Sequence, residues 1–311
     1  MTEICYLKRG ERNAVAAADG AVTFRGRIID SAKKIYIVGN TLFSYAGNAA
    51  IGDEIRYRVE ASLQGSKTPL DTVVQETKRQ YDEVRTRRFI EGPLKHTGFS
   101  PAQWAGRDIP AKTLEDLDGA RRDSHAMDCL ILLGGLNGDR FHIYRVGWPG
   151  TETPIEGGYD SIGSMEPKDS INRGYERIGQ ELKKLENGDR ENIPLATACK
   201  IILRGVQEGW SERGVGGKTQ LVVFEDGVIR DNYTRRQTTF LHNLLLLQDK
   251  EILAPGYVDE AFGRTLDVLD RKKKSKFPGV VHDVVRTIDP KATKRSRDTF
   301  FNILTTTVMI D

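Results

Sequence analysis

The order of expected strands and helices constrains the fold of this chain more than any other feature of the sequence. Short apolar runs on either side of a polar turn predict antiparallel hairpins, and apolar positions that recur every three or four residues predict amphipathic helices. The pattern gives four strands, two helices, two strands, two helices and two strands. Pairs of helices between hairpins predict that helices cover the outer faces of two packed sheets, which is a four-layer αββα sandwich of the α+β class.

These elements fall in separate segments of residues 1–230, which we expect to form the core domain. Strands are expected at residues 3–8, 14–18, 34–38, 41–45, 129–133, 141–146, 220–224 and from 228 onward. Helices are expected at residues 51–63, 70–90, 171–185 and 195–210.

Two further segments interrupt or follow this core. Residues 91–126 contain three prolines and several glycines but no clear period, which indicates an irregular insertion. Beyond residue 231, apolar positions predict one helix near 258–269 and another near 280–288, so residues 231–311 are expected to form an appended helical region. Because the αββα order is complete before this region, we expect it to be dispensable for the core fold.

The composition is that of a globular protein, with 38% hydrophobic and 29% charged residues. No apolar run approaches the ~18 residues that a membrane span requires, so no membrane role is expected. The formal net charge is only +3, and the basic runs at 271–276 and 291–297 have no interleaved aromatic residues, so no nucleic-acid partner is expected.

The N-terminus and the cysteines indicate where the protein works. The first residues lack the apolar segment of a secretory signal, so we expect a cytoplasmic protein. Cys5, Cys129 and Cys199 are odd in number and have no CxxC spacing, which argues against both disulfides and a zinc site. No metal and no cofactor are expected.

The first candidate for chemistry is Thr2. If Met1 is removed, Thr2 carries both a hydroxyl and a free α-amine. An α-amine with an unperturbed pKa near ~7.7 to 8.0 can act as general base for the hydroxyl at neutral pH. Because the first strand of an αββα fold can present its N-terminus in a cleft, Thr2 is the candidate nucleophile.

Short motifs accompany Thr2 in the first fifty residues. They are Ala16-Ala17-Ala18-Asp19-Gly20, Ala32-Lys33-Lys34-Ile35 and Tyr45-Ala46-Gly47. In this order and spacing they resemble the pattern of proteasome β-subunits and the bacterial peptidase HslV, which are N-terminal-nucleophile (Ntn) hydrolases. The resemblance covers roughly residues 2–89 and 127–230.

The resemblance implies a role for each matching residue. Thr2 would be the nucleophile, Lys34 the cation that lowers the proton affinity of the nucleophilic centre, and Asp19 the carboxylate that holds Lys34. A buried ammonium tends to lose its proton unless a carboxylate stabilises it. Gly47, at the start of the first helix, would supply an oxyanion-hole N–H, and Tyr45 would form the base of the first specificity pocket.

Two later motifs depart from the family pattern. Ser164 matches a serine that helps to orient the N-terminal amine, but Met165 follows it where the family has glycine, and a helix N-cap is an alternative reading of Ser164. Glu212 falls where the family has an aspartate. Val215 falls where the family has a serine and lacks its hydroxyl.

Cys5 is a rival nucleophile if residues 1–4 are cleaved off, because a thiolate is intrinsically more nucleophilic than a hydroxyl. The match from Thr2 runs through the first strand without a gap, however. This favours Cys5 as a small buried residue of that strand.

The expected function is that of a threonine-type peptidase that cleaves peptide or protein substrates through an acyl-enzyme intermediate. Two alternatives remain: a non-catalytic ring or scaffold subunit of the same fold, and a small-molecule amidohydrolase with the same nucleophile. The resemblance also implies a homo-oligomeric ring. The sequence has no nucleotide-binding motif, so any unfolding ATPase would be a separate chain.

Overall fold

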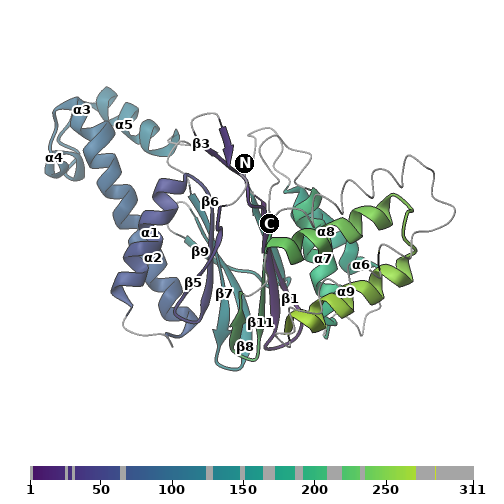
Figure 1. Cartoon of the computed structure of the whole chain (residues 1–311). Helices are drawn as coiled ribbons and strands as arrows, with labels where there is room; N and C mark the ends of the chain where they lie inside the picture. Colours follow the sequence, from purple (N-terminus) through teal and green to yellow (C-terminus); the bar gives the residue numbers. More distant parts are fainter. Residues whose placement is uncertain are drawn as a thin grey trace. The chain divides into compact units, whose positions relative to one another are not determined.

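The computed structural model describes residues 3–24, 27–29, 32–63, 68–123, 129–147, 151–163, 172–185, 192–208, 219–231, 235–270 and 284. These residues form two compact units, each built on an antiparallel sheet with helices packed against it (Figure 1). The first unit comprises Met1–Ile35, Asp139–Phe141 and Gly157–Asp311, and the second comprises Tyr36–Gly138 and His142–Glu156. Two antiparallel sheets with helices confirm the predicted α+β class.

The sheet of the first unit has the strand order β10-β1-β2-β11-β12. Its strands are β10 (Tyr159–Gly163), β1 (Glu3–Lys8), β2 (Ala14–Ala18), β11 (Gln220–Glu225) and β12 (Val228–Arg230). All of β2 is buried, as is β1 from Glu3 to Leu7, so both faces of these central strands are shielded from solvent. The polar turn between β1 and β2 closes the predicted hairpin, in which Cys5 lies opposite Ala17.

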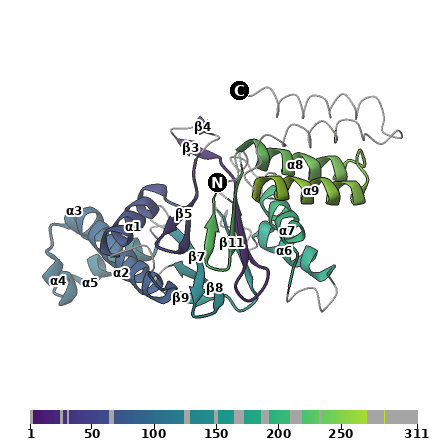
Figure 2. The same ribbon diagram turned by 60° about the horizontal axis from the view of Figure 1, so that its bottom comes forward.

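Helices cover one face of this sheet. They are α6 (Arg173–Lys183), α7 (Leu195–Glu208), α8 (Arg235–Asp249) and α9 (Pro255–Asp270), and Figure 2 shows α8 and α9 side by side. Side chains that alternate along the central strands, such as Cys5 and Leu7, form one buried cluster with apolar residues of all four helices. The inward-facing residues of the strands thus explain the amphipathic pattern of α6 and α7.

The sheet of the second unit has the order β5-β6-β7-β8-β9. Its strands are β5 (Ile35–Val38), β6 (Thr41–Gly47), β7 (Cys129–Asn137), β8 (Arg140–Gly147) and β9 (Thr151–Pro154), and its main helices are α1 (Ala49–Ser62) and α2 (Leu70–Phe89). Phe43 of β6 and Ile131 of β7 pack with Ile55 of α1 and Tyr81 of α2 in a second buried cluster. Gly39, with φ +59°, makes the tight β5–β6 turn that the sequence predicts.

Several elements were not expected from the sequence. They are β9, β10, α8 and a two-stranded ribbon of β3 (Val22–Phe24) and β4 (Arg27–Ile29). The strands are short, and α8 carries apolar residues on several faces, so neither shows a clear period.

The insertion expected to be irregular is largely helical over its described residues. A π-helical turn (Ile90–Leu94) extends α2, and α3 (Lys95–Thr97), α4 (Pro101–Ala105) and α5 (Ala111–Asp123) follow. The start of α4 is a capping box, in which Ser100 and Gln103 exchange side-chain-to-backbone hydrogen bonds. The π-helical turn, α4 and α5 share a small apolar cluster with the end of α2. Most of these helices are too short for a helical period to show in the sequence.

None of the helices in the described part of the chain combines the length and the apolarity that crossing a membrane demands.

The described part of the region beyond residue 231 belongs to the core of the first unit. Phe240, Leu244 and Phe262 are fully buried in the same cluster as Cys5 and Leu7. The expectation that this region is dispensable does not fit such packing, because its removal would expose the apolar faces of α7 and the central strands.

Replacing Leu244 by alanine should therefore destabilise the whole first unit. The side chain is fully buried, so we expect the free energy of unfolding in urea to fall by about 2 to 5 kcal/mol. Lys250→Ala, just beyond the same helix and exposed, is the matched control and should change stability by less than about 0.5 kcal/mol. Equal stabilities of the two variants would show that α8 adds nothing to the core.

Candidate active site

Asp19 and Lys34 form a buried ion pair in the first unit. Asp19 directly follows β2, and Lys34 directly precedes β5. Lys34 Nζ donates to Asp19 Oδ1 at 2.8 Å, and the two side chains are 5% and 0% exposed. The backbone N–H of Glu3 donates to the same oxygen at 2.6 Å, and that of Ala21 donates to Oδ2 at 3.2 Å. The pair predicted from the sequence is present, and it is tied to the start of β1.

Burial and charge oppose each other at Lys34. Burial is the largest influence and lowers the pKa of its ammonium, while Asp19 and Glu3 raise it, so that the pKa stays below the ordinary lysine value. Such an ammonium gives up its proton more readily than a solvated lysine. Its positive charge is also screened less by solvent than the charge of an exposed lysine.

Glu3 brings a second buried carboxylate to this region, and sequence reasoning missed it. Glu3 is 6% exposed and accepts a hydrogen bond from Ser161 Oγ of β10. Cys5 Sγ lies 3.4 Å from Ser161 Oγ and 3.8 Å from Glu3 Oε1. A side chain at Gly174 of α6 would overlap the Glu3 carboxylate, so the helix approaches closely only because it has glycine there. Glu3 is the first residue of β1, and a charged residue at a strand end is ordinarily exposed, so its burial left no clear signal in the sequence.

The surroundings of Cys5 make it a poor nucleophile. The thiol is fully buried, and its pKa is raised well above the ordinary value, first by burial and then by the charge of Glu3. The reactive form of cysteine is the thiolate, which this environment disfavours.

Gly47 and Tyr45 lie in the second unit. Gly47 ends β6 with φ +101°, and Asn48 then caps α1 by accepting from the backbone N–H groups of the first turn. Tyr45 stacks on Tyr36 with ring centroids 5.7 Å apart, and its ring lies so close to Gly52 of α1 that a side chain at Gly52 would overlap it. A strand-to-helix glycine is therefore where the sequence placed it. The roles of Gly47 and Tyr45 stay predictions.

Thr2, Ser164 and Glu212 lie outside the described residues, as do Met165 and Val215. The chain neighbours of the first two are described: Glu3 and Gly163 are opposite each other in the register of β1 and β10.

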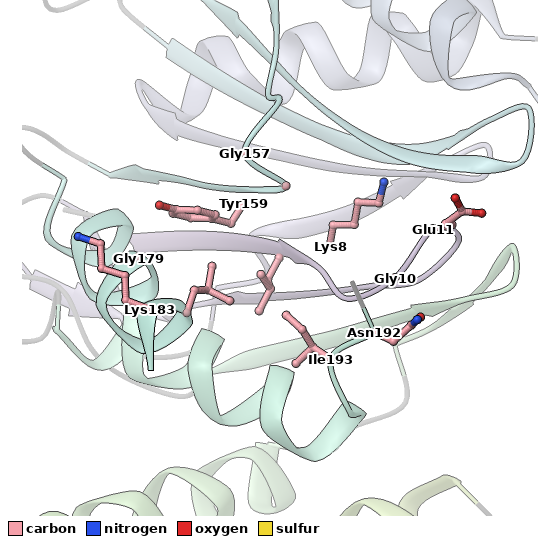
Figure 3. A pocket seen from close by; sticks show the side chains of 12 residues that line it. Lys8, Gly10, Glu11, Gly157, Tyr159, Gly179, Lys183, Asn192 and Ile193 are labelled. Carbon is pink, nitrogen blue, oxygen red and sulfur yellow. The ribbon is translucent and has the colours of Figure 1, made fainter. Parts of the chain in front are cut away.

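A cavity of about 670 Å³ in the first unit is separate from these residues (Figure 3). It is lined by Leu7 and Lys8 at the end of β1 opposite Glu3, which a strand rise of ~3.3 Å per residue places ~13 Å or more from Glu3. Figure 3 shows Tyr159, Lys183 and Ile193 around it. None of the candidate catalytic residues in the described part lines this cavity. Within the same residues, no cluster of three or more histidine, cysteine, aspartate or glutamate side chains could hold a metal ion.

Comparison with known proteins identifies the fold. No family model matches the chain, and no curated protein matches it. Among solved structures, the chain is similar to Anbu from Hyphomicrobium sp. strain MC1, in its Gly-1 mutant form, with a TM-score of 0.51 and 14% identity over 82% of this chain and 98% of that chain. At this identity the likeness shows the fold alone. It confirms the predicted proteasome-like fold of the Ntn-hydrolase type.

The assignment of the chain to the proteasome β-subunit and HslV family is wrong. No family model matches, and the similar Anbu structure is only 14% identical, which defines no family for this chain. The short motifs around Asp19, Lys34 and Gly47 mark a strand end, a strand start and a strand-to-helix junction. Such positions are requirements of the fold, so their agreement indicates the fold and does not establish membership of one family.

The burial of all three cysteines leads to a simple prediction. Cys5, Cys129 and Cys199 are at most 2% exposed, so a thiol reagent such as dithiobis(nitrobenzoate) should find no reactive thiol in the native protein and three after denaturation in guanidinium chloride. Native reaction of Cys5 at the rate of a free thiol would reopen its candidacy as nucleophile.

Proposed function

We propose that the chain hydrolyses amide bonds of peptides with Thr2, freed by loss of Met1, as N-terminal nucleophile. The observation that supports this most is the convergence on one oxygen, Asp19 Oδ1, of Lys34 Nζ and the backbone N–H of Glu3. That N–H belongs to the peptide bond that joins Glu3 to Thr2. Asp19 thus joins a buried cation to the backbone of Glu3, the residue that follows the proposed nucleophile.

The proposed chemistry has two steps. The Thr2 hydroxyl attacks the substrate carbonyl carbon and passes its proton to the α-amine; the C–N bond then breaks, the proton leaves with the amine product, and an ester on Thr2 remains. Water, deprotonated by the same α-amine, then attacks the ester carbon; the bond to Thr2 Oγ breaks, the amine returns the proton to Oγ, and the acyl group leaves as a carboxylic acid. The Lys34 charge favours the deprotonated forms of the hydroxyl and the amine, and Asp19 keeps that charge in place.

The other predicted residues complete this proposal. Ser164 and Glu212 would orient the α-amine, Gly47 would donate its N–H to the developing oxyanion, and Tyr45 would limit the side chain accepted before the scissile bond. The proposal includes a homo-oligomeric ring. The alternative of a non-catalytic ring subunit predicts that Thr2 is not labelled in any of the labelling experiments below. A panel of peptides and small amides separates a peptidase from a small-molecule amidohydrolase.

A peptidyl vinyl sulfone tests the nucleophile directly. Its activated alkene should form a covalent bond with Thr2 Oγ in protein whose intact mass shows loss of Met1, and peptide mapping should place the added mass on Thr2. Thr2→Ala should not be labelled at this position, and Thr2→Ser should be labelled more slowly because it keeps a hydroxyl beside a free amine. Labelling that survives Thr2→Ala and disappears in Cys5→Ala would reverse the assignment. An unlabelled, Met1-free wild type would favour the scaffold.

Lys34→Met tests the role of the cation. Labelling of Thr2 should fall at least 100-fold. The control Lys8→Met replaces the last residue of β1, at the end of that strand far from Glu3, and should label like the wild type. The variant leaves Asp19 buried without its cation, so we expect the free energy of unfolding to fall by about 3 to 5 kcal/mol. Labelling by a folded Lys34→Met protein at the wild-type rate would contradict the proposal.

The pH dependence of labelling follows from the same group. The α-amine must be neutral, and the charge of Lys34 favours that form, so the rate should rise with pH below the ordinary α-amine pKa of ~7.7 to 8.0. Lys34 must be charged and its pKa is lowered by burial, so the rate should fall again at a pH below the ordinary lysine value of ~10.4. A profile of labelling rate against pH should therefore be bell-shaped. A rate that keeps rising beyond pH ~10.4 would show that the charge of Lys34 is not needed.

A further inference from the structure

The side chain of Gln220 holds the backbone that carries Lys34. Residues 32–34 lie outside the strands, and β5 begins only at Ile35. The backbone N–H groups of Lys34 and Ile35 both donate to Oε1 of Gln220, at 3.1 and 3.0 Å. Gln220 Nε2 in turn donates to the carbonyl oxygen of Ile35 at 2.9 Å. One carboxamide thus makes the contacts that a strand backbone would make.

Asp231 fixes the orientation of that carboxamide. Gln220 Nε2 also donates to Asp231 Oδ1 at 3.2 Å, and Asp231 Oδ2 accepts from Lys33 Nζ at 2.9 Å. An ionised carboxylate only accepts hydrogen bonds, so the NH₂ of Gln220 must face Asp231, and its oxygen must face the two backbone N–H groups. With two bonds accepted and two donated, the whole hydrogen-bonding capacity of the carboxamide is used.

Gln220 also connects the two halves of the buried ion pair. It is the first residue of β11 and lies opposite Ala18 of β2, the residue before Asp19. One end of Gln220 is therefore fixed beside Asp19 by the sheet, and the other end holds the backbone of Lys34.

We propose that Gln220, oriented by Asp231, is a positioning residue that holds the backbone at Lys34 and so keeps the Lys34 ammonium on Asp19. This inference rests on the proposed function for its effect on chemistry. A lysine side chain has four rotatable bonds, so holding its ammonium in one place costs conformational entropy. This cost is smaller when the backbone is already anchored, because fewer bonds then remain to be fixed. The charged groups around Lys34 are Asp19 and Glu3 on the side of its ammonium, and Asp231 and Lys33 on the side of its backbone.

Replacing Gln220 by methionine tests the proposal, because methionine has a similar length and flexibility but makes none of the four hydrogen bonds. The first measurement is the saturation kinetics of Thr2 labelling by the peptidyl vinyl sulfone. The maximal rate should fall at least 10-fold while the half-saturating concentration changes less than about 3-fold, since the reaction and not probe binding is affected. Gln75→Met is the matched control: Gln75 also donates to a carboxylate, that of Glu152, but on the exposed surface of the second unit.

The second measurement does not depend on activity. Amide hydrogen exchange of peptic fragments that cover Lys34 and Ile35 should be at least 10-fold faster in Gln220→Met than in the wild type, and unchanged in Gln75→Met. Gln220→Glu has nearly the same shape but faces Ile35 O and Asp231 with an oxygen, so it should behave like Gln220→Met. Gln220→Glu serves as the test variant if Gln220→Met does not fold. If neither folds, Asp231→Leu serves instead, and it should have a smaller effect in the same direction.

The outcomes separate the two proposals. If the wild type is not labelled at Thr2, the proposed function fails, and exchange alone still reports whether Gln220 holds this backbone. Faster exchange with an unchanged labelling rate would overturn the positioning role. Slower labelling with unchanged exchange would also overturn it, because Gln220 would then act by another route.

Discussion

The buried ion pair of Lys34 and Asp19 is the interaction that most constrains the first unit. Placing two charges in a protein interior costs several kcal/mol per ion unless good geometry and further hydrogen bonds compensate. Here Asp19 accepts a hydrogen bond from Lys34 Nζ and others from the backbone N–H groups of Glu3 and Ala21. The β1–β2 register supplies one of these by bringing the start of β1 to the end of β2. The sheet therefore creates the site at which the pair is tolerated.

A second carboxylate makes this arrangement hard to explain by stability alone. Glu3 is buried near Lys34, and its charge contributes to the pKa of that lysine, so two buried acids accompany one base. An apolar core of the same volume is often at least as stable as a buried pair. Groups of this kind, with pKa values shifted by burial and by specific neighbours, are concentrated at functional sites. The physical cost is thus itself an argument that the site has a chemical role.

Local rules predicted the elements whose signals lie within a few residues. Turn residues and apolar periods gave the β1–β2 and β5–β6 hairpins and the helices α1, α2, α6 and α7 close to their observed bounds. The Lys34–Asp19 pair followed from a resemblance, not from a rule. The role of Gln220 could not be predicted in either way, because Gln220 belongs to no recognisable motif and contacts a backbone 186 residues earlier in the chain. The same short motifs indicated the fold correctly and the family wrongly, since they lie at strand ends and at a strand-to-helix junction, which belong to the fold.

The helices beyond residue 231 contact the segment that carries Gln220. His242 of α8 is fully buried, and its Nδ1 lies 3.3 Å from Oγ1 of Thr219, the residue before Gln220. Burial lowers the pKa of His242 to about 4, opposed by a hydrogen bond with the backbone of Leu203, so the ring is neutral at physiological pH. A neutral imidazole can form a hydrogen bond to a buried hydroxyl without the cost of a buried charge. Thr219 thus connects the start of β11 to α8. The next residue, Gln220, connects it to the backbone of Lys34. The C-terminal helices are therefore part of the structure that aligns the proposed active site.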